Sequence, residues 1–172
     1  MFTKPQDIVI ALKLALGGKA QTYADLGASL GLSASEAHAG VRRLIEARLL
    51  DPESKRVLKR ALRNFLVHGV PHAFPVQARE LTRGIPTAWG APVLSGRIIS
   101  GDQLPPVWPD PSSNIQGYAV EPLYPSVPKA AQRDPLLYGI LALVDALRIG
   151  RARERDLATR EIDERLNLHA AA

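Results

Sequence analysis

The placement of the prolines restricts the fold of this chain more than any other feature of its sequence. Of the 14 prolines, 12 lie between Pro71 and Pro135. Proline lacks a backbone N–H and its ring blocks the preceding helical turn, so long helices and central strands are unfavourable in that stretch. The chain therefore divides into three parts, residues 1–68, 69–135 and 136–172. We predict a mainly α protein, α+β at most, with helices in the first and last parts.

The middle part carries enough apolar side chains to be ordered in spite of its prolines. We expect an irregular segment that packs over the helices and contains at most a small antiparallel sheet. Three stretches have the composition of short strands, and they are residues 73–76, 91–99 and 115–120. Trp89 and Trp108 can either anchor these loops to the core or line a small-molecule pocket, and anchoring is the more common role.

The net charge of +5 belongs entirely to the first part of the chain. Residues 1–68 contain 11 lysines and arginines against 6 aspartates and glutamates, whereas the middle and last parts are each balanced. The excess is concentrated between Arg42 and Arg63. A local excess of cations is typical of a surface that meets an anionic partner, so the first part is where we expect one.

The sequence offers no set of residues for catalysis or metal binding. It has no cysteine, which removes disulfides, thiolate zinc sites and cysteine nucleophiles. His68 and His72 are four residues apart, but Gly69 and Pro71 between them disfavour the helix that would make them a metal pair. We find neither a nucleophile motif nor a phosphate-binding loop. We therefore expect no metal, no cofactor and no enzymatic activity.

Two features bear on where the protein resides. Lys4, Asp7 and Lys13 interrupt the apolar N-terminal stretch, which is not the pattern of a signal peptide. The longest apolar run, residues 136–147, is too short to cross a bilayer. We expect a cytoplasmic protein that does not enter a membrane.

Capping residues divide the first part into short helices. Pro5 suits the start of a first helix, which Gly17 and Gly18 would end. A second helix is expected between Thr22, as N-cap, and Gly31, and a third begins at the Ser33–Glu36 capping box. Two short helices joined by a turn, with a preceding helix to pack on, are typical of a helix-turn-helix.

The stretch from Thr22 to Leu50 resembles the winged helix-turn-helix of MarR-like bacterial transcriptional regulators, and the likeness covers about residues 5–50. The positions in register with that family are Leu26, Leu30, Leu32, the Ser33 cap, Val41, Leu44 and Leu49. The resemblance implies that the chain binds double-stranded DNA with the third helix in the major groove.

The residue types on the outer side of the third helix agree with this function. Arginine can bond both acceptors of a guanine, and serine and histidine can reach base edges or phosphates. Our candidates for groove contacts are Ser35, His38, Ala39, Arg42 and Arg43, and those for phosphate contacts are Thr22, Lys55, Arg56, Lys59, Arg60 and Arg63. The alternative for both sets is an ordinary solvated surface.

The sequence departs from the family after Leu50, where a winged helix continues into a two-stranded hairpin. Apolar residues recur at helical spacing from residue 55 to residue 67, with lysines and arginines on the other side. We predict a basic amphipathic helix over 55–67, capped by Ser54, in place of a strand pair. The wing is then missing or displaced into the middle part.

The last part is expected to form a helical hairpin. Residues 136–147 are apolar nearly all round, and residues 151–166 carry one apolar stripe with charges of alternating sign. The apolar helix either completes the core of its own chain or forms a homodimer, as DNA-binding proteins of this type commonly do. We interpret the protein as a transcriptional regulator, most simply a repressor. The alternative is a protein–protein module, such as an antitoxin-like component that binds a partner protein and regulates its own operon.

Overall fold

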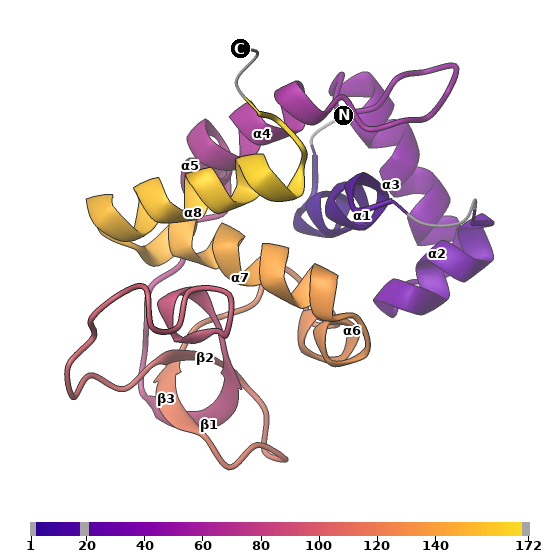
Figure 1. Ribbon diagram of the computed structural model, residues 1–172. Helices are drawn as coiled ribbons and strands as arrows, with labels where there is room; N and C mark the ends of the chain where they lie inside the picture. The colour runs from indigo at the N-terminus through magenta and orange to yellow at the C-terminus, as the bar shows by residue number, and fades with distance from the viewer. Residues whose placement is uncertain (1–2, 18–20, 170–172) are drawn as a thin grey trace.

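The computed structural model describes residues 3–17 and 21–169, and Gly18, expected to help end the first helix, lies outside them (Figure 1). The predicted mainly α architecture with a small sheet is confirmed. The helices are α1 (Pro5–Ala15), α2 (Tyr23–Leu30), α3 (Ala34–Glu46), α4 (Lys59–His68), α5 (Val70–Ala73), α6 (Val127–Arg133), α7 (Pro135–Ile149) and α8 (Ala152–Arg165), with a 3-10 turn η1 (Ala88–Gly90). The strands are β1 (Leu81–Pro86), β2 (Pro106–Pro109) and β3 (Gln116–Ala119).

The capping residues of α2 and α3 act as expected. Thr22 Oγ1 accepts a hydrogen bond from the Asp25 N–H at 3.1 Å, and Ser33 Oγ accepts one from the Glu36 N–H at 3.1 Å. Between the two helices, Gly31 adopts a left-handed backbone with φ of +69°. These local bonds satisfy helix-terminal groups and set where each helix begins and ends.

The segment between α3 and α4 differs from the prediction. Leu50 and Val57 form an antiparallel bridge, flanked by hydrogen bonds from Asp51 N–H to Arg56 carbonyl at 2.9 Å and from Leu58 N–H to Leu49 carbonyl at 2.8 Å. We call residues 50–57 the hairpin. The predicted helix over 55–67 is therefore wrong at its start, and α4 begins at Lys59.

Local chemistry explains the hairpin. The Asp51 carboxylate accepts hydrogen bonds from the Ser54 N–H and hydroxyl, both at 2.7 Å, so Ser54 belongs to a turn and does not cap α4. Lys55 has a left-handed φ of +55°, which a helix cannot contain. The single bridge between Leu50 and Val57 lies here, immediately after α3, where the sequence predicted a helix.

The three strands of the middle part close into a very small barrel (Figure 1). β1 pairs antiparallel with β2 and with β3, and β2 pairs parallel with β3. The sheet is therefore mixed, and not antiparallel throughout as expected. Of the predicted strand pieces, only residues 115–120 contain a strand, because residues 73–76 begin with the last residue of α5 and residues 91–99 form turns and bends. The three prolines of the sheet, Pro86, Pro106 and Pro109, lie at strand ends, where the missing N–H costs least.

α7 is the central helix of the molecule. Leu137 and residues 139–147 are buried, and the helix packs against α1, α4, α5, α6, α8 and η1. Figure 1 shows it between α8 and the small barrel. The expected alternative, burial of this helix in its own chain, is confirmed. A homodimer stays a prediction, and its interface would have to lie outside the covered faces of α7.

Polar contacts fasten the three parts of the chain to each other. Arg63 of α4 pairs with Asp163 of α8 at 2.8 Å, and Lys13 of α1 pairs with Asp134 at 2.6 Å. Asp145 of α7 is buried, and its carboxylate accepts hydrogen bonds from Thr87 Oγ1, Trp108 Nε1 and Arg148 Nη1 at 2.7, 2.7 and 2.8 Å. Trp108 thus anchors the barrel to the core, the more common of its two expected roles. In the part of the chain that the structure describes, no helix is long and apolar enough to span a bilayer.

Candidate nucleic-acid interface

The outer face of α3 is built by the periodicity of the helix. Ala37, Val41 and Leu44 are buried against the core, which leaves Ser35, His38 and Arg42 exposed and Ala39 half-buried. The side chains available on this face are short and polar or cationic, as the sequence predicts for these four positions. Gly40 instead faces α1, because a Cβ atom there would lie 3.0 Å from an Asp7 carboxylate oxygen.

Arg43 does not share that face, and the prediction that it points outward is wrong. Its side chain is buried, and its Nε and Nη2 atoms donate to the two carboxylate oxygens of Asp7 in α1, both at 2.7 Å. These hydrogen bonds raise the pKa of Arg43 above its ordinary value. A bidentate pair of this kind fixes α3 on α1 and leaves the guanidinium unavailable for a base. Arg43 is therefore a structural residue.

Tyr23 of α2 contacts both α3 and the hairpin, a role that no sequence pattern indicated. Its ring meets the His38 ring edge-on, with centroids 4.9 Å apart. Lys55 Nζ donates to the Tyr23 hydroxyl at 3.2 Å and lies 5.6 Å from the ring centroid. One aromatic residue thus contacts a candidate groove residue on one side and a candidate phosphate residue on the other. Its place directly after the Thr22 cap was the only local signal.

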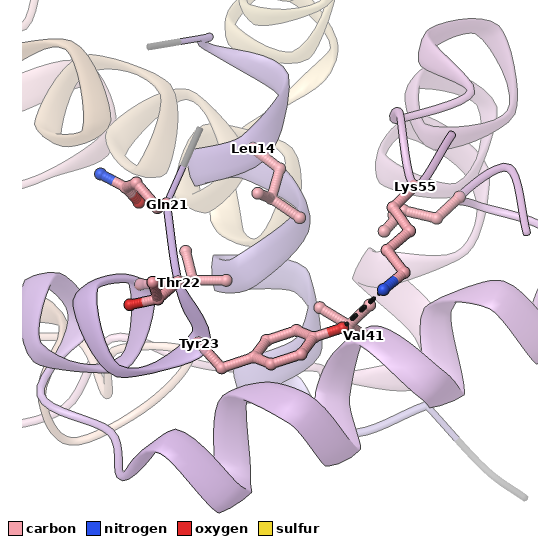
Figure 2. Close-up of a pocket in the computed structure, with 8 residues that line it drawn as sticks. Leu14, Gln21, Thr22, Tyr23, Val41 and Lys55 are labelled. Atoms are coloured by element: carbon pink, nitrogen blue, oxygen red, sulfur yellow. Dashed lines mark hydrogen bonds between the residues drawn. The ribbon is translucent and has the colours of Figure 1, made fainter. Parts of the chain in front are cut away.

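A cavity of about 310 Å³ lies behind this tyrosine. Figure 2 shows Tyr23 and Lys55 joined across its rim, with Leu14 and Val41 also on its wall. The other lining residues are Gln21, Thr22, Leu26 and Leu50. The cavity is lined by residues of α1, α2, α3 and the hairpin, and the Lys55 side chain bonds Tyr23 of α2 at its edge.

The hairpin supplies two of the predicted phosphate residues. Lys55 and Arg56 are both exposed, and the Tyr23 contact places Lys55 beside the outer face of α3. Arg48 adds a further exposed cation just after α3, with a left-handed φ of +57°. These positions are brought to α3 by the bridge between Leu50 and Val57, which the helical periodicity of the sequence concealed.

The cations of α4 lie elsewhere. Arg63 is bound to Asp163 through two hydrogen bonds of 2.8 and 3.2 Å, and Arg60 lines a cavity with Arg63, Asp163 and Leu168. This side of α4 faces α8, so the structure does not bring Arg60 and Arg63 together with α3. Lys59 is half-buried at the start of α4. The predicted continuous basic face is thus divided between the hairpin and the α4–α8 contact.

Thr22 is exposed, but its hydroxyl is already engaged. It accepts from the Asp25 N–H and donates to Asp25 Oδ2 at 2.8 Å. A phosphate at this hydroxyl would meet the Asp25 carboxylate, and like charges in contact are unfavourable. The geometry therefore favours a capping role for Thr22.

Within residues 3–17 and 21–169, no three histidines, aspartates or glutamates gather in a way that could hold a metal ion. Comparison of the chain with protein-family models, with curated proteins and with solved structures gives no match. A function for this chain is therefore inferred from the surface formed by α3, Tyr23 and the hairpin.

Proposed function

We propose that this protein binds double-stranded DNA, with α2 and α3 as a helix-turn-helix and the hairpin as a short wing. The observation that carries the proposal is the joint placement of two cationic elements. An N-capped helix exposes Ser35, His38 and Arg42, and a hairpin with exposed Lys55 and Arg56 is fastened beside it through Tyr23. An exposed helix of this kind fits the major groove, and an adjacent cationic hairpin can follow the phosphates.

Each element has a separate role in this proposal. Arg42 reads a base edge, most favourably a guanine, while Ser35 and His38 contact bases or phosphates and the small side chain of Ala39 permits close approach. Lys55 and Arg56 contact phosphates and supply affinity that does not depend on sequence. Arg43, Arg60 and Arg63 are left out, because their side chains are engaged with or directed toward other parts of the same chain.

The test is binding to labelled duplexes of about 30 bp, followed by fluorescence anisotropy from about 50 to 200 mM NaCl. One duplex is taken from the DNA immediately upstream of the gene that encodes the chain, and a shuffled duplex is the reference. We expect Arg42→Ala to weaken binding to the upstream duplex roughly 5- to 150-fold and to reduce the preference over the shuffled one. The matched control is Arg153→Ala, an exposed arginine of α8, which should leave binding unchanged.

The hairpin has its own readout in the same experiment. Lys55→Ala with Arg56→Ala should weaken binding to both duplexes alike and lower the salt slope by about 2, since about two phosphate contacts are lost. Arg60→Ala should leave the slope unchanged because this residue lies on the α8 side of α4. Absence of binding at the lowest salt concentration, or equal binding by the wild type and Arg42→Ala, would contradict the proposal.

A transcriptional regulator, most simply a repressor, is the cellular role that such binding would serve. We further propose that it binds as a homodimer on two half-sites, as helix-turn-helix proteins commonly do. Sedimentation equilibrium of the protein–duplex complex gives the number of chains per duplex, and one chain per duplex would rule out the homodimer.

A protein–protein module is the second candidate, and exposed apolar residues on the barrel favour it. Leu81 and Tyr118 are cross-strand partners and are 56% and 44% exposed, and Ile99, in the segment between η1 and β2, is 90% exposed. A surface of this kind is a candidate for contact with another protein. If the chain and the proteins of its own operon are co-expressed, a partner should co-purify with the wild type and be lost with Leu81→Ser and Tyr118→Ser. Unchanged co-purification would exclude this surface.

A further inference from the structure

Arg165, at the end of α8, is a cation that has no ionic partner among the described residues. Its Nε atom is buried and has no hydrogen-bond partner, and among the described residues the side chain makes no ion pair. A buried guanidinium N–H that is left unbonded costs free energy, so nearly all such groups in folded proteins find an acceptor. The buried Nε is closed to a ligand, but no described residue bonds the Nη1 or Nη2 groups either, so these two groups are free to bond an acceptor from outside the described chain.

The acidic residues of the same helix do not supply that acceptor. Glu161 pairs with Arg97, Asp163 pairs with Arg63, and Glu164 lies 3.8 Å from His169. Each neighbouring carboxylate is thus directed toward another residue. The charge of Arg165 remains uncompensated in a helix whose other charges are of alternating sign.

The guanidinium borders a cavity of about 360 Å³ between α7, α8 and the turns that follow η1. The other lining residues are mostly apolar, and they are Ala91, Pro92, Val93, Pro135, Tyr138 and Gly139. The Tyr138 hydroxyl donates to the Pro86 carbonyl at 2.5 Å, so the tyrosine presents its ring to this space with its proton already bonded. Among the described residues that line this cavity, Arg165 is the one that carries a charge.

Gly139 makes room for the guanidinium. A Cβ atom at this position would lie 3.3 Å from Arg165 Nη1, slightly closer than an ordinary contact, and 3.4 Å from Cζ. The missing side chain lets the guanidinium lie flat against the backbone of α7. The absence of a side chain at Gly139 therefore lets the charge lie at the edge of this cavity.

We propose that this cavity binds a small organic monocarboxylate. The guanidinium bonds the carboxylate through its Nη1 and Nη2 groups, a pairing that its planar fork permits, and the apolar part of the ligand lies against Pro92, Val93 and the Tyr138 ring. A volume of about 360 Å³ is at the small end of ligand cavities. A single cation among apolar walls fits one negative charge on an apolar body better than a phosphate, which would need further donors.

The test uses benzoate as the probe, measured by isothermal titration calorimetry on the whole chain without DNA, so that its result does not depend on the proposed DNA binding. Benzamide has the same shape without the charge, and acetate has the charge without the apolar body. We expect benzoate to bind at least about tenfold more tightly than either of them. Benzoate binding no tighter than benzamide binding, or no heat from benzoate at concentrations up to about 10 mM, would overturn the proposal.

Variants locate the site. Arg165→Gln should weaken benzoate binding at least about tenfold, whereas Arg160→Gln, at an exposed arginine of the same helix, should leave it unchanged. Gly139→Ala provides a second test that retains the charge and displaces the guanidinium, and it should weaken binding as well. Circular dichroism of each variant checks that it is folded. Wild-type affinity in folded Arg165→Gln, or in Gly139→Ala if the first variant is unfolded, would contradict the assignment.

Discussion

Two adjacent arginines on α3 have opposite environments, because neighbouring residues on a helix point about 100° apart. Arg42 points into solvent, and Arg43 is buried on the two carboxylate oxygens of Asp7. The proposed function uses the first, and the packing of α3 on α1 uses the second. The pair therefore offers matched substitutions that separate DNA binding from stability.

We predict that Arg43→Ala lowers the free energy of unfolding by about 3 kcal/mol, because it leaves the Asp7 carboxylate buried without its partner. Arg42→Ala should change it by less than about 0.5 kcal/mol. Urea unfolding followed by circular dichroism measures both. Adding Asp7→Ala to Arg43→Ala should recover part of the loss, and equal stabilities of the two single variants would show that the buried pair contributes nothing.

Asp145 is a second buried ionisable residue, and its burial makes the stability of the protein depend on pH. Burial raises the pKa of its carboxyl, although Arg148, Thr87 and Trp108 act in the opposite direction. The folded protein therefore holds a proton at Asp145 at pH values where the unfolded chain has released it. It follows that the contribution of this residue to stability falls as pH rises from the ordinary pKa of aspartate through its raised value.

We accordingly predict that Asp145→Asn removes this loss of stability with rising pH. Relative to the wild type, the variant should gain stability as pH rises from about 4 to about 8, as measured by urea unfolding at several pH values. Asp156→Asn, at an exposed aspartate of α8, is the control and should follow the wild type. A difference between wild type and Asp145→Asn that does not vary with pH would contradict the prediction.

At the scale of elements, short connections decide which surfaces meet. The turn between α2 and α3 is held against α6 by a hydrogen bond of 2.5 Å from Ser126 Oγ to the Leu30 carbonyl. At Gly31 a Cβ atom would also lie 2.8 Å from Ser126 Cβ. The connection is therefore restricted by its own left-handed backbone and by a neighbour from the end of the middle part.

A comparison of two glycines separates the effect of the left-handed backbone from that of the contact with Ser126. Gly17 and Gly31 both have a left-handed φ, of +80° and +69°, but nothing lies within 4 Å of a Cβ at Gly17. We predict that Gly17→Ala costs about 1 kcal/mol for the backbone alone, and that Gly31→Ala costs more because Ser126 must also move. Thermal or urea unfolding measures both. Equal losses would mean that the contact with Ser126 yields freely.

The whole molecule is organised around α7, and all three parts of the chain contribute to one hydrophobic cluster. Ile8 of α1, Trp108 of β2 and Leu143 of α7 are among its buried members. The ion pairs of Arg63 with Asp163 and of Lys13 with Asp134 join the same parts at the surface. The boundaries that the prolines mark in the sequence therefore separate kinds of structure that share a core.

This shared core predicts a single cooperative unfolding transition. Both tryptophans, Trp89 and Trp108, lie in the middle part, whereas circular dichroism reports mainly on the helices of the other two. We expect urea transitions followed by tryptophan fluorescence and by circular dichroism to coincide. Separate midpoints would show that the barrel region unfolds independently of the helices around α7.

The sequence by itself determined the features that depend on neighbouring residues. Thr22, Gly31 and Ser33 place the ends of α2 and α3 through bonds that span three residues, and helical periodicity identifies Ser35, His38 and Arg42 as exposed. The two helices at the end of the chain were also predictable, because apolar runs and helix-ending residues act locally.

Only the tertiary structure decided which of these residues meet. Arg43 is buried because Asp7, 36 residues earlier, offers both of its oxygens. Helical spacing alone could not reveal the hairpin, since an Asp51–Ser54 turn and the Leu50–Val57 bridge replace the first turn of the predicted helix. The barrel and the buried α7 likewise depend on contacts between distant segments. Local patterns restrict the conformation of each residue, whereas the partner of a side chain is set by packing across the whole chain.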